Sequence, residues 1–256
     1  MNTIHEVNRK RWDAASEEWA RGADRRGLWR RCVTEPSLVL CDRELAYLGD
    51  VSGKDACVLG SGDNQVAFAL SGMGAQVTSV DISQRQLDVA KRSAEELHLS
   101  MPFLRADVTD LSEIGDATFD LVYTGGHVAV WVSDLDVYYG EAARILRADG
   151  LFMVTEYHPF RRVWRESQNE LAVEYPYCDR GPFVYDVTAN LDGHKPGPLK
   201  SYEYHWTVSD FLNAVLKSDC RLLEVHEFQE NVAEWEGAPM QGLPECMLIV
   251  ARRCRE

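Results

Sequence analysis

The stretch Leu59-Gly60-Ser61-Gly62-Asp63-Asn64 stands between an apolar run and the start of a helical pattern. Ala56–Leu59 before it is short and apolar, which predicts a buried strand, and Gln65–Ser71 after it predicts a helix. Glycine at such a turn lets the backbone pass close to a ligand, and the start of the helix offers unpaired amide groups. The stretch is therefore typical of a ligand-binding turn, although G-x-G alone is a short motif.

Short β-branched runs alternate with helix-length amphipathic stretches through the centre of the chain. This alternation requires a parallel sheet with right-handed crossovers and helices on both faces. The capping-box patterns Ser83–Gln86 and Ser133–Asp136 place a serine at the start of two of the helices. The predicted strands are Ala56–Leu59, Gln76–Val80, Pro102–Arg105, Phe119–Thr124 and Leu151–Tyr157, and the predicted helices are Gln65–Ser71, Ser83–Leu97 and Asp134–Leu146.

The two ends of the chain differ from this centre. Residues 1–48 have a helical pattern of their own and are expected to form a cap outside the sheet. Residues 160–205 are rich in aromatic residues, proline and glycine, which indicates loops and edge strands. We interpret residues 1–256 as a single α/β domain with that segment inserted. The remainder predicts a helix from Thr207 to about Ser218, with a capping box, and two strands, Leu222–Gln229 and Cys246–Arg252.

Two acidic residues follow the next two strands. Asp81 lies about twenty residues after the glycines, where a carboxylate can accept hydrogen bonds from both hydroxyls of a ribose. Asp107 can accept a hydrogen bond from an adenine amino group, while the Val108 amide can donate one to a ring nitrogen. Each acid alone could be a solvated loop residue, but glycines and acids in register at the carboxyl ends of parallel strands favour a nucleoside site.

The spacing also indicates which nucleoside ligand to expect. A dinucleotide fingerprint requires G-x-G-x-x-G, because the last glycine allows tight packing of helix on strand. Gln65 occupies that position here. The missing glycine argues against binding of a pyrophosphate. It therefore also argues against a nicotinamide-dependent oxidoreductase, which is the alternative interpretation for a sheet of this kind.

Five short motifs resemble those of the class I S-adenosylmethionine-dependent methyltransferases, in particular the broad small-molecule group. The resemblance covers the chain from Trp12 to Tyr157 and extends more loosely to the last two strands. It implies a Rossmann-like, seven-stranded, mostly parallel sheet with helices on both faces and the last strand antiparallel, and it implies S-adenosyl-L-methionine as the cofactor. The motifs are Val58–Gly62, Val80–Ser83, Ala106–Val108, Phe119–Val122, and Ala143–Leu146 with Asp149-Gly150.

Carried over to this sequence, the resemblance implies where each part of the cofactor binds. Gly60 and Gly62, with Ser61 between them, would face the methionine part, and the backbone around Thr124 would receive its amino group. Asp81 would bind the ribose. The adenine would lie on Ile82, with its edge at Asp107 and Val108, and Gln86 would either touch the nucleoside or only complete the capping box.

Two positions depart from the family pattern. The family usually has an acid two residues before the first glycine, where this sequence has Val58, and Asn64 replaces the third glycine. Both changes concern the methionine end of the site. The missing acid motivates a third interpretation, in which the chain binds the cofactor without turnover.

Two histidines are candidate general bases. His127 follows the fourth strand and His158 the fifth, and an imidazole titrates near neutral pH. Methyl transfer depends mainly on an in-line approach to a deprotonated nucleophile, so a base is optional and either histidine could instead bond to loop backbone. The cluster Arg161, Arg162 and Arg165 could bind an acidic group of the acceptor or form a solvated face.

Composition excludes several partners. With 27 Lys and Arg against 41 Asp and Glu, the net charge is −14, which repels nucleic acid. No apolar run approaches the roughly 18 residues of a membrane helix, and no signal region opens the chain. The seven scattered cysteines do not resemble a disulfide framework.

We therefore expect a cytoplasmic methyltransferase that acts on an oxygen or nitrogen of a small-molecule acceptor. No nucleic acid, membrane or metal is expected to bind, and a homodimer is compatible with the sequence. The helical cap (1–48) and the inserted segment (160–205) would form the lid and the acceptor-recognition pocket.

Overall fold

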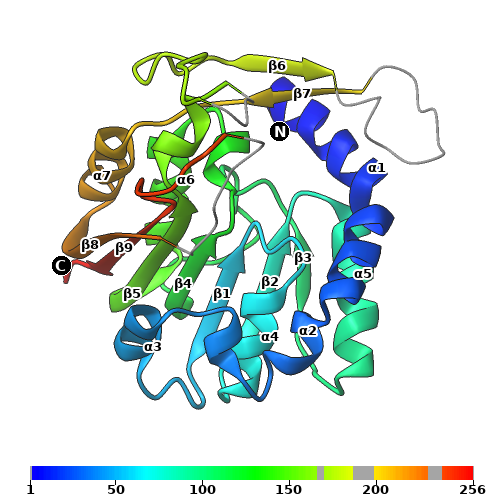
Figure 1. The fold of residues 1–256 in the computed structure, drawn as a ribbon. Coiled ribbons are helices and arrows are strands. Elements are labelled where there is room, and N and C mark those ends of the chain that lie inside the picture. The colour runs from blue at the N-terminus through cyan, green and yellow to red at the C-terminus, as the bar shows by residue number, and fades with distance from the viewer. Residues whose placement is uncertain (1, 166–169, 187–198, 230–237, 256) are drawn as a thin grey trace.

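The computed structural model describes residues 2–165, 170–186, 199–229 and 238–255. Seven strands form one sheet in the order β3-β2-β1-β4-β5-β9-β8 (Figure 1). Strands β1 to β5 pair in parallel, and β9 runs antiparallel to both β5 and β8. The predicted sheet, with its last strand reversed, is confirmed. Its strands are β1 (Asp55–Leu59), β2 (Gln76–Asp81), β3 (Phe103–Arg105), β4 (Phe119–Gly125), β5 (Leu146–Tyr157), β8 (Cys220–Phe228) and β9 (Cys246–Arg253).

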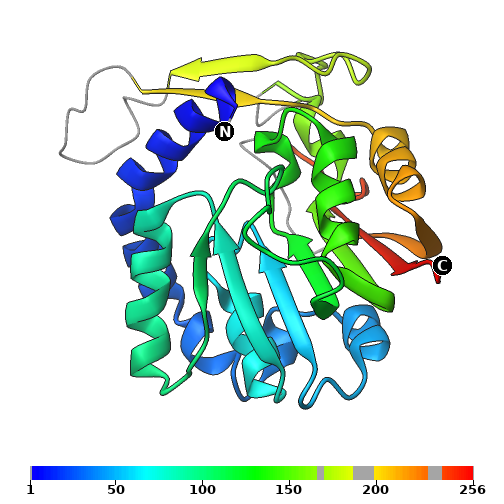
Figure 2. The same ribbon diagram turned by 180° about the vertical axis from the view of Figure 1, so that it is seen from behind.

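Helices cover both faces of the sheet (Figures 1 and 2). One face packs against α6 and α7 through a core that includes Tyr139 and Phe211, and the other packs against α2 to α4 around Phe68. Successive residues of β5 serve opposite cores, Phe152 the first and Met153 the second, as the two-residue period of a strand requires. The helices are α2 (Leu28–Arg31), α3 (Asp42–Leu48), α4 (Gln65–Gly72), α5 (Gln84–Glu96), α6 (Leu135–Arg144) and α7 (Val208–Lys217).

The helix starts follow the predicted caps with one exception. Ser83 caps α5 by accepting a hydrogen bond from the Gln86 amide at 3.2 Å, and Thr207 forms a capping box at α7. The prediction for α6 is wrong by one residue, because its cap is Asp134, whose carboxylate accepts from the Val137 amide. Ser133 is engaged elsewhere: its Oγ lies 3.0 Å from Nε2 of a histidine in the N-terminal helix.

The N-terminal helix α1 (Thr3–Arg26) packs along α5 and reaches the carboxyl ends of the parallel strands (Figure 1). Strands β6 (Phe183–Asp186) and β7 (Lys200–Glu203) form a separate antiparallel pair over the same edge. Asn8 joins the two, because its Oδ1 accepts from the Tyr202 amide at 2.8 Å and its Nδ2 donates to the Tyr202 carbonyl at 2.9 Å. The short helices are η1 (Pro36–Leu38), η2 (Ala129–Trp131) and η3 (Pro159–Arg162).

Parts of the predicted insertion, residues 166–169 and 187–198, lie outside the described residues. None of the helices in the described ranges is long and apolar enough to cross a membrane.

Candidate functional site

A cavity of about 620 Å³ lies at the carboxyl ends of the central strands, and residues of α1 and β7 also line it. Nearly all of the residues proposed from the sequence meet there. Thr124 does not: its side chain points into the core, where its hydroxyl bonds to that of Tyr138, and its neighbours Tyr123 and Gly125 line the cavity instead. The predicted residues on the wall are Gly60, Ser61, Gly62, Asp81, Ile82, Gln86, Asp107, Val108 and His127.

The glycine turn brings the backbone against the cavity. Gly60 has a φ of +61°, and a Cβ there would lie 2.5 Å from Cγ2 of Val128, so a side chain at this position would clash. Asn64 takes the place of the third glycine with the same left-handed φ of 61°, a conformation that asparagine tolerates better than most residues. Its Nδ2 donates to the Gly62 carbonyl at 2.9 Å and its Oδ1 accepts from Ser79 Oγ at 2.6 Å. The replacement therefore preserves the turn.

Asp81 fastens this turn to the next helix. Its Oδ2 accepts from the Gly62 amide at 2.9 Å and its Oδ1 accepts from the Ser83 amide at 2.8 Å. The residue is 7% exposed, and burial raises the pKa of its carboxyl despite these bonds. Asp81 thus presents a fixed hydrogen-bond acceptor at the cavity wall.

Asp107 is held by a partner that the sequence did not indicate. His5 Nδ1 lies 2.7 Å from its Oδ2, and Thr109 donates to its Oδ1 from both its amide and its hydroxyl. His5 Nε2 accepts from the Ser133 amide, so the proton lies on Nδ1 and the imidazole donates to Asp107. Burial acts to raise the pKa of Asp107, but the bonds from His5 and Thr109 outweigh it and lower that pKa.

At the methionine end of the site, the residue of β1 at the position of the family's acid is Val58, which lines the cavity. A buried carboxylate lies behind this wall instead. Glu44 of α3 accepts from the hydroxyls of Tyr123, at 2.7 Å, and Thr155, at 2.5 Å, and both of these residues line the cavity. Sequence reasoning missed Glu44 because its partners lie 79 and 111 residues away.

The two candidate bases differ in position. His127 lines the cavity, and its Nε2 bonds to the Arg162 guanidinium. Burial, and then the charges of Arg162 and other cations, hold the pKa of His127 well below its usual value, so the ring is neutral at pH 7. His158 is not on the cavity wall: its Nδ1 accepts from the Phe160 amide and its Nε2 bonds to Glu227 at 2.7 Å.

Glu156 is another titratable group on the wall, and sequence reasoning assigned it no role. Its carboxylate accepts from the amides of His127, Val128 and Ala129 at 2.9–3.0 Å, and so fixes the loop that carries His127. Burial raises the pKa of Glu156 to about 7. Titratable groups with such perturbed pKa values concentrate at functional sites.

Of the three clustered arginines, only Arg162 lines the cavity. Arg161 is buried with its guanidinium 4.2 Å from the Tyr157 ring centre, and Arg165 is exposed. A cation from a distant part of the chain, Arg11 of α1, joins Arg162 on the wall. The three arginines therefore do not face the cavity together, and Arg165 lies beyond the end of η3 (Pro159–Arg162).

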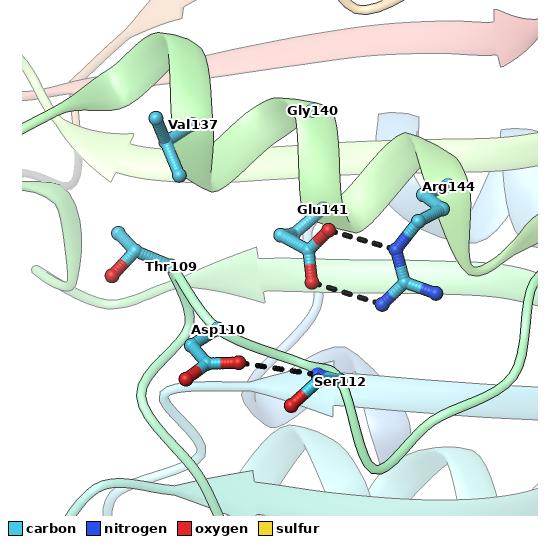
Figure 3. A pocket seen from close by; sticks show the side chains of 7 residues that line it. All are labelled: Thr109, Asp110, Ser112, Val137, Gly140, Glu141 and Arg144. Carbon is cyan, nitrogen blue, oxygen red and sulfur yellow. Dashed lines mark hydrogen bonds and ion pairs between the residues drawn. The ribbon is translucent and has the colours of Figure 1, made fainter. Parts of the chain in front are cut away.

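A second hollow lies on the surface between α6 and the loop after β3 (Figure 3). There Glu141 and Arg144 point toward each other and form two hydrogen bonds, of 2.7 and 2.9 Å. Glu141 and Arg144 thus satisfy one another. Across the described part of the chain, no group of three or more His, Cys, Asp and Glu residues could hold a metal ion.

Known proteins share both the sequence pattern and the fold. Residues 57–154 match the family model of a methyltransferase domain. An uncharacterized methyltransferase, YbaJ, of Bacillus subtilis is 27% identical over 194 residues, which is 70% of this chain and 74% of the relative. A ubiquinone biosynthesis O-methyltransferase of Bartonella bacilliformis is 23% identical over 133 residues, or 52% of each chain.

Among solved structures, an S-adenosylmethionine dependent methyltransferase of Mesorhizobium loti has a TM-score of 0.64 at 24% identity, over 81% of this chain and 94% of that one. The geranyl diphosphate C-methyltransferase of Streptomyces coelicolor, solved with S-adenosyl-L-homocysteine, has a TM-score of 0.56 at 16% identity, over 82% and 76%. At these identities the two structures establish the fold. Together with the domain match over residues 57–154 and the relatives, they support a class I S-adenosylmethionine-dependent methyltransferase.

Proposed function

We propose that the chain transfers a methyl group from S-adenosylmethionine to an oxygen or nitrogen of a small-molecule acceptor bound in the 620 Å³ cavity. One observation carries the proposal: a single cavity joins the glycine turn and its two acids to a set of aromatic, basic and titratable side chains. Its size falls in the range of small-molecule sites, which suits a nucleoside cofactor beside a compact acceptor.

The described residues fit the cofactor. Close approach of a ligand requires a bare backbone, and Gly60, which lines the cavity, supplies it. Asp81 and Asp107 are buried carboxylates, which accept hydrogen bonds, and ribose hydroxyls and an adenine amino group donate them. We assign the ribose to Asp81, the adenine to Ile82, Asp107 and Val108, with Gln86 beside it, and the methionine part to residues 60–62 and the backbone around Thr124.

S-adenosylmethionine supplies an activated methyl group when bound, so the protein mainly has to position the acceptor and manage one proton. His127 is the first candidate for that proton because it lines the cavity and is neutral; its Nε2 accepts from the Arg162 guanidinium and has to release that bond to take the proton. Glu156 is the second, since its pKa of about 7 allows both protonation states near neutral pH. His158 ranks last, because both of its ring nitrogens have protein partners away from the wall.

We further propose that α1 and the described parts of the inserted segment cover the bound ligands. Arg11 and Trp12 on α1, Arg162 on η3 and Glu203 on β7 all line the cavity. A cytoplasmic location is also proposed, and it rests on the seven scattered cysteines, which are unpaired in the described ranges.

The test is calorimetric titration of the purified chain with S-adenosylhomocysteine and with NAD. We expect the first to bind and the second not to bind. Binding of NAD alone would instead support a nicotinamide-dependent oxidoreductase. Formation of S-adenosylhomocysteine from S-adenosylmethionine with a panel of phenols and amines then tests turnover, and tight binding without turnover on any acceptor would favour a non-catalytic binding module.

A further inference from the structure

One wall of the cavity carries hydrogen-bond donors that none of the described residues satisfies. Arg11 reaches it from α1, and its guanidinium carbon lies 4.5 Å from the ring centre of Trp12 and 4.8 Å from that of Trp131. Its Nε and Nη1 are buried and have no hydrogen-bond partner among the described residues. The Nε1 of Trp131 is also buried without a hydrogen-bond partner among the described residues. Two neighbouring side chains therefore present unmatched donors to one region.

Neither Glu203 nor Glu156, the two carboxylates on this part of the wall, forms an ion pair with Arg11 within the described residues. Glu203, whose side chain is 10% exposed, lies 3.3 Å from Nη1 of Arg162 and forms an ion pair with that arginine. The two carboxylate oxygens of Glu156 already accept hydrogen bonds from three backbone amides. Burial lowers the pKa of Arg11, the charge of Glu203 opposes this in part, and the charge of Arg162 lowers the pKa further. In the described ranges, Arg11 forms no ion pair of its own.

A buried cation without an anion is costly, and ring faces offset only part of that cost. Guanidinium groups bind carboxylates and phosphates strongly, with up to two parallel hydrogen bonds. The net charge of −14 would otherwise repel anions, so an anionic ligand needs a local cation to enter the cavity.

We propose that Arg11, with Arg162 beside it, binds an anionic group of the methyl acceptor, a carboxylate or a phosphate, while Trp12 and Trp131 pack against the body of that molecule. The inference rests on the proposed function and names the class of its acceptor, an organic acid with a flat or apolar body. Arg11 is then a specificity-determining residue, and the neighbouring His127 faces the same molecule.

The first test uses the chain saturated with S-adenosylhomocysteine, titrated with benzoate, phenyl phosphate and uncharged benzamide. We expect at least one anion to bind about tenfold or more tightly than benzamide, as hydrogen bonds to charged groups allow. Arg11→Gln should remove about 10- to 100-fold of that affinity, and Arg11→Lys should keep part of it. Arg21→Gln, the same change at an exposed position of α1, serves as the matched control and should have no effect.

A second variant is expected to change the affinity for the anion in the opposite direction. Glu203→Gln removes the carboxylate that competes for Arg162, so anion binding should become tighter, which damage to the fold would not produce. The affinity for S-adenosylhomocysteine is measured in every variant. Failure of the wild type to bind it would refute the proposed function. Intact cofactor binding with both anions no tighter than benzamide, or with an unchanged anion affinity in Arg11→Gln, would overturn this inference alone.

Discussion

Replacing Asp81 by alanine tests the cofactor assignment most directly. The carboxylate accepts from the Gly62 amide at 2.9 Å and from the Ser83 amide at 2.8 Å, and each of its oxygens can accept a second bond. We assign those remaining positions to the ribose hydroxyls. The substitution therefore removes two structural bonds and two proposed ligand bonds at once, and the two losses have separate readouts.

The magnitudes follow from these contacts. Loss of hydrogen bonds to a charged group costs about 1.5–3 kcal/mol, so the affinity for S-adenosylhomocysteine should fall about 10- to 150-fold. The two amides that lose their acceptor should lower the free energy of unfolding by about 1–3 kcal/mol each. We expect values near the lower end, because the adjoining cavity admits water to both amides.

Calorimetric titration below the melting temperature gives the first quantity, and urea unfolding without ligand gives the second. Asp88→Ala is the matched control, because Asp88 is an exposed carboxylate of α5 with one side-chain bond, to Gln84. Asp81→Asn, which keeps an acceptor but not the charge, should have an intermediate affinity. An unchanged affinity in Asp81→Ala, with lower stability, would refute the ribose assignment and leave Asp81 only its structural role.

Three further predictions concern the bases and the turn. His127→Ala should lower kcat by roughly 10²–10⁴-fold at nearly constant cofactor affinity if His127 takes the acceptor proton; a large fall in melting temperature with unchanged kcat would assign it a structural role, as we expect for His158→Ala. For Glu156, burial raises the pKa from 4.5 to about 7, so its contribution to stability is present below pH 4.5 and is lost, by up to about 3 kcal/mol, as the pH rises through 7. Glu156→Gln should lack this pH dependence in urea unfolding, and equal slopes for variant and wild type would contradict it. Asn64→Ala should lower the free energy of unfolding by about 1–2 kcal/mol or more, because alanine is strained at positive φ. Asn64→Gly should avoid this strain and lose only the side-chain hydrogen bonds. Equal free energies of unfolding for the alanine and glycine variants would show that the turn relaxes.

The sheet could be predicted from the sequence because its signals are local. Buried strands such as β4 appear as short apolar runs, and the helices that follow carry their own caps and periodicity. The glycine turn and the acids at the ends of β2 and β3 are also fixed by position along the chain, so their meeting at one edge follows from parallel pairing alone. The cap of α6 was misplaced because Ser133 and Asp134 are both good caps, and a contact with His5 decided between them.

The rest of the site depends on contacts across long stretches of chain. His5 and Asp107 are 102 residues apart, and Asn8 and Tyr202 are 194 apart. Such pairs leave no mark on local patterns. The same holds for Arg11. In the sequence it is one of several charged residues of a predicted helix, and only the tertiary structure shows that it lies beside Trp131.

The face of α1 that meets the cavity nevertheless has a recognisable order. His5, Asn8, Trp12 and Trp19 line the cavity at intervals of three, four and seven residues, which places them on one side of a helix. His5 fixes the acid assigned to the adenine, Asn8 fixes β7, and Arg11, three residues further, faces the proposed acceptor anion. A stripe that fills a core would be apolar, whereas this one begins with polar side chains whose partners lie on separate parts of the fold, Asp107 after β3 and Tyr202 on β7. Because one helix carries contacts to both ligands, local displacement of α1 should weaken the cofactor and acceptor sites together, whereas a change confined to the Arg11 guanidinium should affect the acceptor site alone.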